Sequence, residues 1–182
     1  MAGVNIQLDL TSPGAQTIGV ALHWTPQQSV QTLSLPVWTP GSYTVRDPSQ
    51  HLHSLSAVQG DRVLDLERRS PERWEFSCAS GEPLCIRYRL EARQLTVRTN
   101  HLDPDFASLS LPAVVMLVEG ERWNEHCLQV SVPEHWSVAV PLSHDAIGSV
   151  YLAKDFDQLL DAPVHAGTFH PERLCVRGHD HE

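Results

Sequence analysis

Alternation of apolar and polar residues with a period of two is the feature that most constrains the fold of this 182-residue chain. The clearest run covers residues 84–92, where every second side chain is apolar. Since successive side chains of a strand point to opposite faces of a sheet, this pattern predicts strands with one buried face. The alternation recurs at residues 4–10, 18–24, 33–37, 74–78, 128–132 and 136–140.

Residues typical of turns separate these runs. Gly60-Asp61, for example, lies between two short strand-like runs and predicts a hairpin. Short strands with frequent turns indicate an all-β fold, either an antiparallel β-sandwich or a saddle-like twisted sheet with at most one or two short helices. The expected helical turn lies at residues 154–160, where Phe156, Leu159 and Leu160 are spaced i, i+3, i+4.

Length and composition limit the class of protein. The chain has the size of one domain, and we expect a β-rich domain over residues 1–178 followed by a tail at 179–182. The formal net charge of −9 disfavours nucleic acid and anionic membrane as partners. No stretch has the length and apolarity of a membrane span, and the start lacks signal-peptide features, so we expect a cytoplasmic protein. The chain stops just after a strand-like run at residues 174–178, so we expect a longer parent protein.

The motifs of common hydrolases and nucleotide-binding proteins are absent: no H-E-x-x-H helix, nucleophile elbow, phosphate loop or dinucleotide fingerprint is found. His51 and His53 would share a face of a strand and, with His101 or Asp103 as a third ligand, could bind zinc. Spacing alone does not bring that third ligand near. We therefore assign this chain no catalytic residue, no metal ligand and no cofactor.

The segment "LPVWTPGSYTVRD", residues 35–47, predicts a strand, a corner and a second strand. Proline followed by glycine at 40 and 41 fits the two central positions of a type II turn. We expect Trp38 to be buried before the corner, and Tyr43 and Val45 to share one face of the strand after it. Tyr43 and Arg46 would then be able to reach a ligand from the corner.

Three segments resemble, in the expected order, motifs of the M61 peptidases, the glycyl aminopeptidase group. Residues 35–47 resemble the family's W-x-P-G-S-Y-x-[VI]-R segment, and residues 95–103 resemble its V-R-T-x-x-L-D strand. Residues 155–164 resemble its D-Y-D-x-L-x-D-S-P segment. The chain departs from the family at residues 104–110, which read PDFASLS where the family often has a G-F-F-N-G-T-like stretch.

The resemblance implies a non-catalytic, β-rich N-terminal domain of a zinc-dependent aminopeptidase. Zinc would be bound by an H-E-x-x-H helix in a following thermolysin-like domain. The partners would be that catalytic domain of the same parent chain and a peptide substrate, whose ammonium group acidic or amide groups can help to hold. The candidate residues for the substrate cleft or the domain interface are Tyr43, Arg46, Arg98, Thr99 and Asp103.

Two other classes remain open from the sequence. One is a free-standing β-sandwich that binds carbohydrate or protein on a platform of exposed aromatics, for which Trp24, Trp123 and Trp136 are the candidates. The other is a small metalloenzyme that uses His51 and His53.

Overall fold

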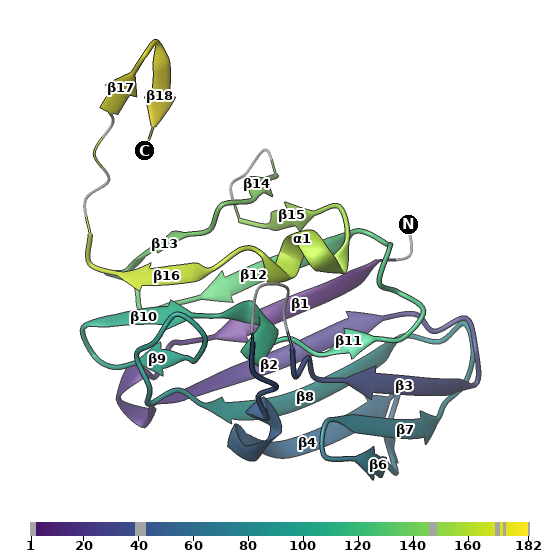
Figure 1. Cartoon of the computed structure of the whole chain (residues 1–182). Helices are drawn as coiled ribbons and strands as arrows, with labels where there is room; N and C mark the ends of the chain where they lie inside the picture. The colour runs from purple at the N-terminus through teal and green to yellow at the C-terminus, as the bar shows by residue number, and fades with distance from the viewer. Residues whose placement is uncertain (1–2, 39–42, 146–148, 170–171, 173, 182) are drawn as a thin grey trace.

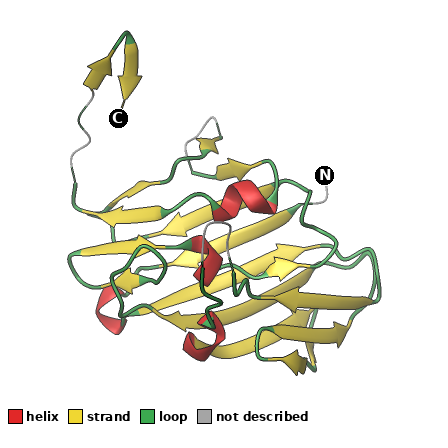
Figure 2. Cartoon of the chain, in the orientation of Figure 1, coloured by secondary structure: helices red, strands yellow, loops and turns green. Residues whose placement is uncertain are grey.

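Strands make up most of the computed structural model, which describes residues 3–38, 43–145, 149–169, 172 and 174–181 (Figure 2). The all-β prediction is confirmed. The largest sheet has eight strands, in the order β14 (Ser143–His144), β15 (Tyr151–Ala153), β12 (His126–Ser131), β1 (Val4–Asp9), β2 (Thr17–Trp24), β8 (Leu84–Glu91), β4 (Leu52–Gln59) and β5 (Arg62–Leu64).

The large sheet is mixed rather than purely antiparallel. Among the described strand pairs only β1 and β12 are parallel, with Val4 opposite His126 and Asp9 opposite Ser131. Residues 10–125 connect these two strands, and a connection of that length permits a parallel crossover, which a tight hairpin turn does not.

Two four-stranded sheets pack on one face of the large sheet (Figure 1). Their strands are β13 (Ser137–Ala139), β16 (Val164–Gly167), β10 (Phe106–Leu109) and β9 (His101–Leu102) in one, and β11 (Leu117–Val118), β3 (Val30–Ser34), β7 (Arg73–Ser77) and β6 (Glu67–Ser70) in the other. The helices are η1 (Pro13–Ala15), η2 (Pro48–His51), η3 (Leu111–Ala113) and α1 (Phe156–Leu160). Within the described residues none has the length and apolarity of a bilayer-spanning helix.

A single apolar core fills the space between the large sheet and the two small ones. β8 shows how the sequence pattern produces it: Leu84, Ile86, Tyr88 and Leu90 are buried, while the residues between them are partly or fully exposed. β3 and β7 contribute from the opposite side with Leu33, Trp74 and Phe76. The alternation read from the sequence therefore marks the core-facing side of the strands correctly.

Three local predictions are confirmed. β4 and β5 form the hairpin at Gly60, whose φ of 57° lies in the region that favours glycine. α1 begins after Asp155, whose carboxylate accepts a hydrogen bond from the backbone N–H of Gln158 at 2.8 Å, as an N-cap residue does. The strand-like run near the C-terminus is β17 (Leu174–Val176).

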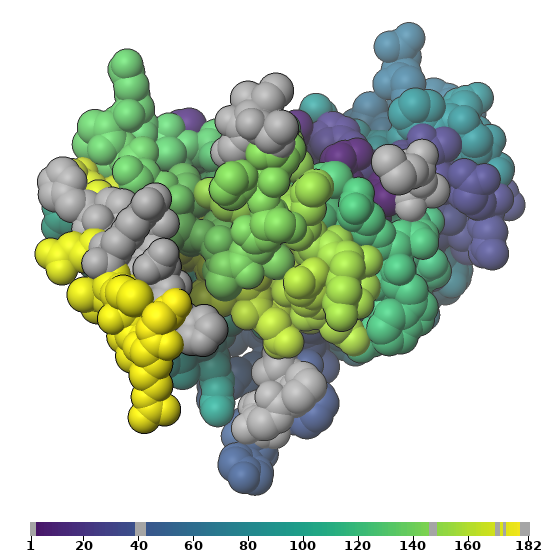
Figure 3. All heavy atoms as spheres, turned by 90° about the horizontal axis from the view of Figure 1, so that it is seen from above, coloured from purple at the N-terminus to yellow at the C-terminus, as the bar shows by residue number. Residues whose placement is uncertain are grey.

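β17 pairs with β18 (His179–His181) in a separate two-stranded hairpin. From above, the hairpin lies at one edge of the molecule, while the segment around α1 covers the middle of that face (Figure 3). The expected boundary after Gly178 falls between the two strands of this hairpin.

Candidate functional site

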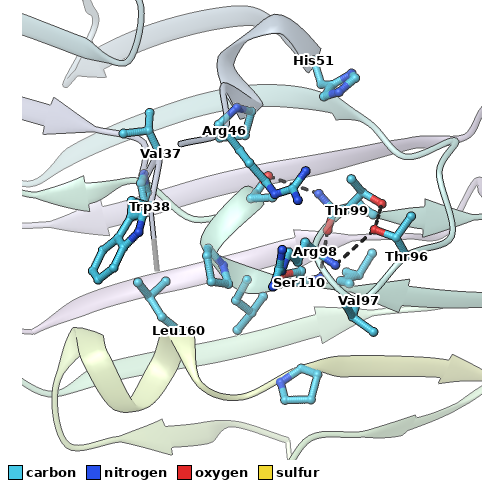
Figure 4. A pocket seen from close by; sticks show the side chains of 18 of the residues that line it. Val37, Trp38, Arg46, His51, Thr96, Val97, Arg98, Thr99, Ser110 and Leu160 are labelled. Atoms are coloured by element: carbon cyan, nitrogen blue, oxygen red, sulfur yellow. Dashed lines mark hydrogen bonds between the residues drawn. The ribbon is translucent and has the colours of Figure 1, made fainter. Parts of the chain in front are cut away.

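A wide, open groove with a volume of about 1670 Å³ lies on the side of the molecule formed by the small sheets and their loops. Residues from three parts of the chain line it: 34–51, 91–122 and 156–165. These parts overlap all three segments that resemble the M61 motifs. The fold therefore brings together segments that are far apart in the sequence (Figure 4).

The first wall is the segment that precedes and forms η2. Its backbone is held by the Arg46 N–H, which donates to the Val37 carbonyl at 2.8 Å. Asp47 then caps η2: its carboxylate accepts from the backbone N–H of Ser49 at 3.0 Å and from the Ser49 hydroxyl. An aspartate at the N-cap followed by proline is a common start signal for a helix, and here it fixes the end of the wall.

The predicted strand–corner–strand at residues 35–47 is wrong for both of its strands within the described residues: β3 ends at Ser34, and residues 35–38 form no strand. The structure shows no strand over residues 43–47, and Tyr43 is fully exposed. Trp38, which we expected to be buried, has 53% of its surface exposed at the edge of the groove. The expected turn itself, at residues 39–42, lies outside the described part of the chain. Residues 43–47 pair with none of the described strands, and Leu35 is the last buried core residue before them.

The second wall is a loop at residues 93–100. The family motif predicted a strand over residues 95–103, which is wrong for residues 95–100, while residues 101–102 form β9. Hydroxyl groups close the loop. The Thr99 hydroxyl donates to the Gln94 carbonyl at 2.7 Å, so the Thr96 hydroxyl, 2.8 Å away, donates to the Thr99 oxygen. Thr96 in turn accepts from the Arg98 N–H at 3.2 Å. This network leaves the Arg98 backbone in a defined position.

Asn100 anchors this loop to the rest of the domain. Its buried side chain donates to the Ala113 carbonyl at 3.1 Å and accepts from the Ser110 N–H at 2.9 Å. The sequence contained no signal for this role, since asparagine is common in ordinary turns. Arg93, which also lines the groove, was missed for a similar reason: arginines are frequent on solvated faces.

The five candidate residues do not form one cluster. Arg46, Arg98 and Thr99 line the groove, whereas Tyr43 and Asp103 are not among its lining residues. Asp103 accepts from the backbone N–H groups of Phe106 and Asp105 at 3.0 and 2.9 Å and contacts the His101 ring at 3.0 Å. These hydrogen bonds, led by that from Phe106, lower the pKa of the Asp103 carboxyl. Its observed role is to shape the turn before β10.

The charges in the groove are distributed unevenly. Several carboxylates already have partners: Glu119 lies 3.5 Å from Arg73, Asp157 lies 2.8 Å from Arg122, and Asp47 caps η2. By contrast, no carboxylate in the described part of the chain forms an ion pair with Arg46, Arg93 or Arg98. The groove therefore presents free guanidinium groups, although the chain as a whole is acidic.

The described residues contain no group of three or more histidine, cysteine, aspartate or glutamate side chains able to hold a metal ion. His51 ends η2, while His53 follows on β4, where it lies 3.6 Å from Glu91. They are therefore not two residues of one strand, as the metalloenzyme hypothesis required. The aromatic platform is wrong as well, because Trp24 and Trp136 are core residues and only Trp123 is exposed.

Comparisons with known proteins agree with the motifs. The family model described as the peptidase M61 N-terminal domain matches residues 5–168. An aminopeptidase N family protein from Idiomarina loihiensis is 26% identical, with a TM-score of 0.89 over 97% of this chain and 31% of its own. An M1 zinc metallopeptidase from Deinococcus radiodurans (9% identity, TM-score 0.57) aligns with 91% of this chain and 41% of its own.

Aminopeptidase A from Legionella pneumophila, solved in complex with aspartic acid, is 12% identical with a TM-score of 0.56, over 94% of this chain and 22% of its own. At such identities the M1 enzyme and this aminopeptidase show a shared fold alone. The chain spans well under half the length of each of the three proteins. No functionally curated protein sequence gave a match.

Proposed function

Since the chain belongs to the family of peptidase M61 N-terminal domains, we propose that it packs through its groove side against the catalytic domain of a zinc-dependent aminopeptidase and forms one wall of the substrate cleft. Its structural neighbours include an aminopeptidase N family protein and an M1 zinc metallopeptidase, each of which it spans only in part, and this supports pairing with a catalytic domain. The described residues offer no zinc site, so the metal and the catalytic groups are assigned to the partner domain.

The observation that carries this proposal is the apolar rim of the groove. We use this name for Trp38, Leu95 and Val97, which line the groove and whose exposed fractions are 53%, 58% and 91%. They stand on the two walls described above, around arginines that have no ion-pair partner in the described structure. Exposed apolar side chains together with arginine are typical of protein interfaces, and a cluster of this kind is unusual on a surface that faces only water.

Activity measurements test whether the catalytic groups lie outside this domain. We expect the 182-residue chain to hydrolyse no glycyl or alanyl amide, with or without added zinc. A longer protein that contains this domain should carry an H-E-x-x-H helix and show hydrolysis that a chelator abolishes. Chelator-sensitive hydrolysis by the 182-residue chain itself would contradict the proposal.

Substitutions in the apolar rim test the docking face. In the longer protein, Val97→Asp should weaken the contact between the domains, lowering both thermal stability and activity. In the 182-residue chain the same change should leave stability nearly unaltered, because Val97 is exposed there. Val63→Asp is the matched control: Val63 is also exposed (77%) but lies on β5, away from the groove. Equal effects of the two changes in the longer protein would place the interface elsewhere.

A further inference from the structure

The free charges of the groove suggest which end of a peptide it accepts. A peptide substrate carries an ammonium group at one end and a carboxylate at the other. Arg46, Arg93 and Arg98 would repel the first and attract the second. We infer that Arg46 and Arg98 bind a carboxylate group of the peptide that enters the groove; this inference rests on the proposed function. It replaces our expectation that this domain contacts the ammonium group.

The positions of the two arginines support a binding site. Arg46 points from its wall toward the loop that carries Arg98 and Thr99 (Figure 4). Both backbones are held by hydrogen bonds, from the Arg46 N–H to Val37 and from the Arg98 N–H to Thr96. The guanidinium groups, by contrast, have no ion pair with the described carboxylates. Like charges directed into one groove repel each other, and a bound anion relieves that repulsion.

A carboxylate is the anion whose geometry fits this arrangement. The guanidinium group presents a planar fork of N–H donors that matches the two oxygens of a carboxylate. The groove carboxylates in the described structure are unsuited to supply it, since Asp47, Glu119 and Asp157 are engaged elsewhere. Asp161 is the one acid of the groove with neither an ion pair nor a side-chain hydrogen bond among the described residues. It follows Leu160 at the end of α1, in the third part of the chain that lines the groove.

Direct binding to the 182-residue chain tests the inference without relying on activity. The probes are trialanine, which has a free C-terminal carboxylate, and trialanine amide, which lacks it. NMR should show the Arg46 and Arg98 Nε–H resonances shifting with trialanine at a dissociation constant on the order of 1 mM, as for a few exposed charge-assisted contacts. The amide should cause no such shift. Arg46→Gln and Arg98→Gln should each weaken binding by about three- to tenfold.

Arg87→Gln is the matched control, because Arg87 is an exposed arginine on β8 that does not line the groove. It should leave trialanine binding unchanged. Equal binding of acid and amide, no response at concentrations well above the expected constant, or the same weakening by Arg87→Gln would each overturn the inference. Because this assay needs no catalysis, an inactive longer protein would refute the proposed function and leave the binding result standing.

The carboxylate that binds the arginines could come from the peptide or from the catalytic domain. Activity measurements on the longer protein distinguish these two sources. If the peptide supplies it, wild type should favour trialanine over its amide in kcat/KM, and Arg98→Gln should remove that preference. If a carboxylate of the catalytic domain occupies the site instead, Arg98→Gln should lower thermal stability and reduce activity equally on both peptides. The second result would overturn the inference.

Discussion

β8 and the loop that follows it two residues later have similar sequence patterns but different structures. β8 alternates apolar and polar residues and forms a regular strand between β2 and β4. Leu95 and Val97 also alternate with polar residues, one residue out of phase with β8, yet they belong to a loop in which both side chains are exposed. Period two therefore predicts a strand only where neighbouring strands and a core are available to pair with it.

The same difference separates β3 from the residues that follow it. β3 pairs with β7 and buries Leu33, whereas Tyr43 and Val45 alternate with polar residues but pair with none of the described strands and remain exposed. In the 93–100 loop, side-chain hydroxyls and the Asn100 amide satisfy backbone groups that a ladder satisfies in β8. The walls of the groove are thus ordered by polar contacts, and their apolar side chains are left for a partner surface under the proposed function.

The largest effect on stability should come from a substitution in β8, the regular strand of this comparison. Ile86 lies in the middle of β8, is completely buried, and is opposite Leu22 and Ala57 on the neighbouring strands. Ile86→Ala should lower the free energy of unfolding by about 2–5 kcal/mol, because it removes buried methyl groups and leaves a cavity. Urea denaturation of the 182-residue chain measures this change.

Val63→Ala provides the control for that experiment. Val63 belongs to the same sheet but is 77% exposed, so its truncation should change stability by less than about 0.5 kcal/mol. A large loss from Val63→Ala, or a small one from Ile86→Ala, would show that burial does not separate the two kinds of segment.

A good part of the fold was predictable for the same physical reason. Where alternation coincides with burial, as in β1, β2 and β8, the sequence contains the strand and its core-facing side. The α1 helix was predictable from the spacing of Phe156 and Leu159. The parallel pairing of β1 with β12 was not, because neighbours in a sheet depend on contacts between residues that are distant in the sequence.

The candidate site was only partly predictable. Motif resemblance selected Arg46, Arg98 and Thr99, and the fold places all three on one groove. It also selected Asp103, whose hydrogen bonds shape a turn instead. Motifs record which residues recur together without stating where their side chains point. The exposure of Trp38 and the anchoring role of Asn100 depend on where the core ends, which local sequence does not reveal.

The next largest effect on stability should come from Asn100, which anchors the 93–100 loop. Asn100→Ala leaves the Ser110 N–H and the Ala113 carbonyl without their amide partner in a partly buried site. We expect a loss of about 1–3 kcal/mol in the free energy of unfolding, the usual penalty for unsatisfied buried polar groups. Urea denaturation checks this value, and Asn100→Asp should lose at least as much at neutral pH, because its carboxylate keeps an acceptor for Ser110 but places a buried charge against the Ala113 carbonyl. If Asn100→Ala left the free energy of unfolding unchanged, the loop would not depend on this amide.

A smaller effect is expected from the hydroxyl network of the same loop. Thr99→Val keeps the shape of the side chain but removes the donor to the Gln94 carbonyl. We expect a cost of about 1 kcal/mol, confined to local opening of the loop. Hydrogen exchange should therefore accelerate at the Arg98 N–H, whose acceptor Thr96 is tied to Thr99. Thr99→Ser retains the hydroxyl and should exchange like wild type; if it behaves like Thr99→Val, methyl packing rather than hydrogen bonding holds the loop.

The smallest effect on stability should come from Val97. Like Ile86, it alternates with polar residues in the sequence, but its side chain is exposed and that of Ile86 is buried. Val97→Ser removes an apolar side chain that is 91% exposed, so the stability of the 182-residue chain should change by less than about 0.5 kcal/mol. Urea denaturation of Val97→Ser and Ile86→Ala under the same conditions compares the two losses of stability directly. A loss of about 2 kcal/mol or more would indicate that Val97 is buried in solution, as large losses require buried groups. The loop would then belong with the regular strands, and the apolar rim would no longer be available for a partner domain.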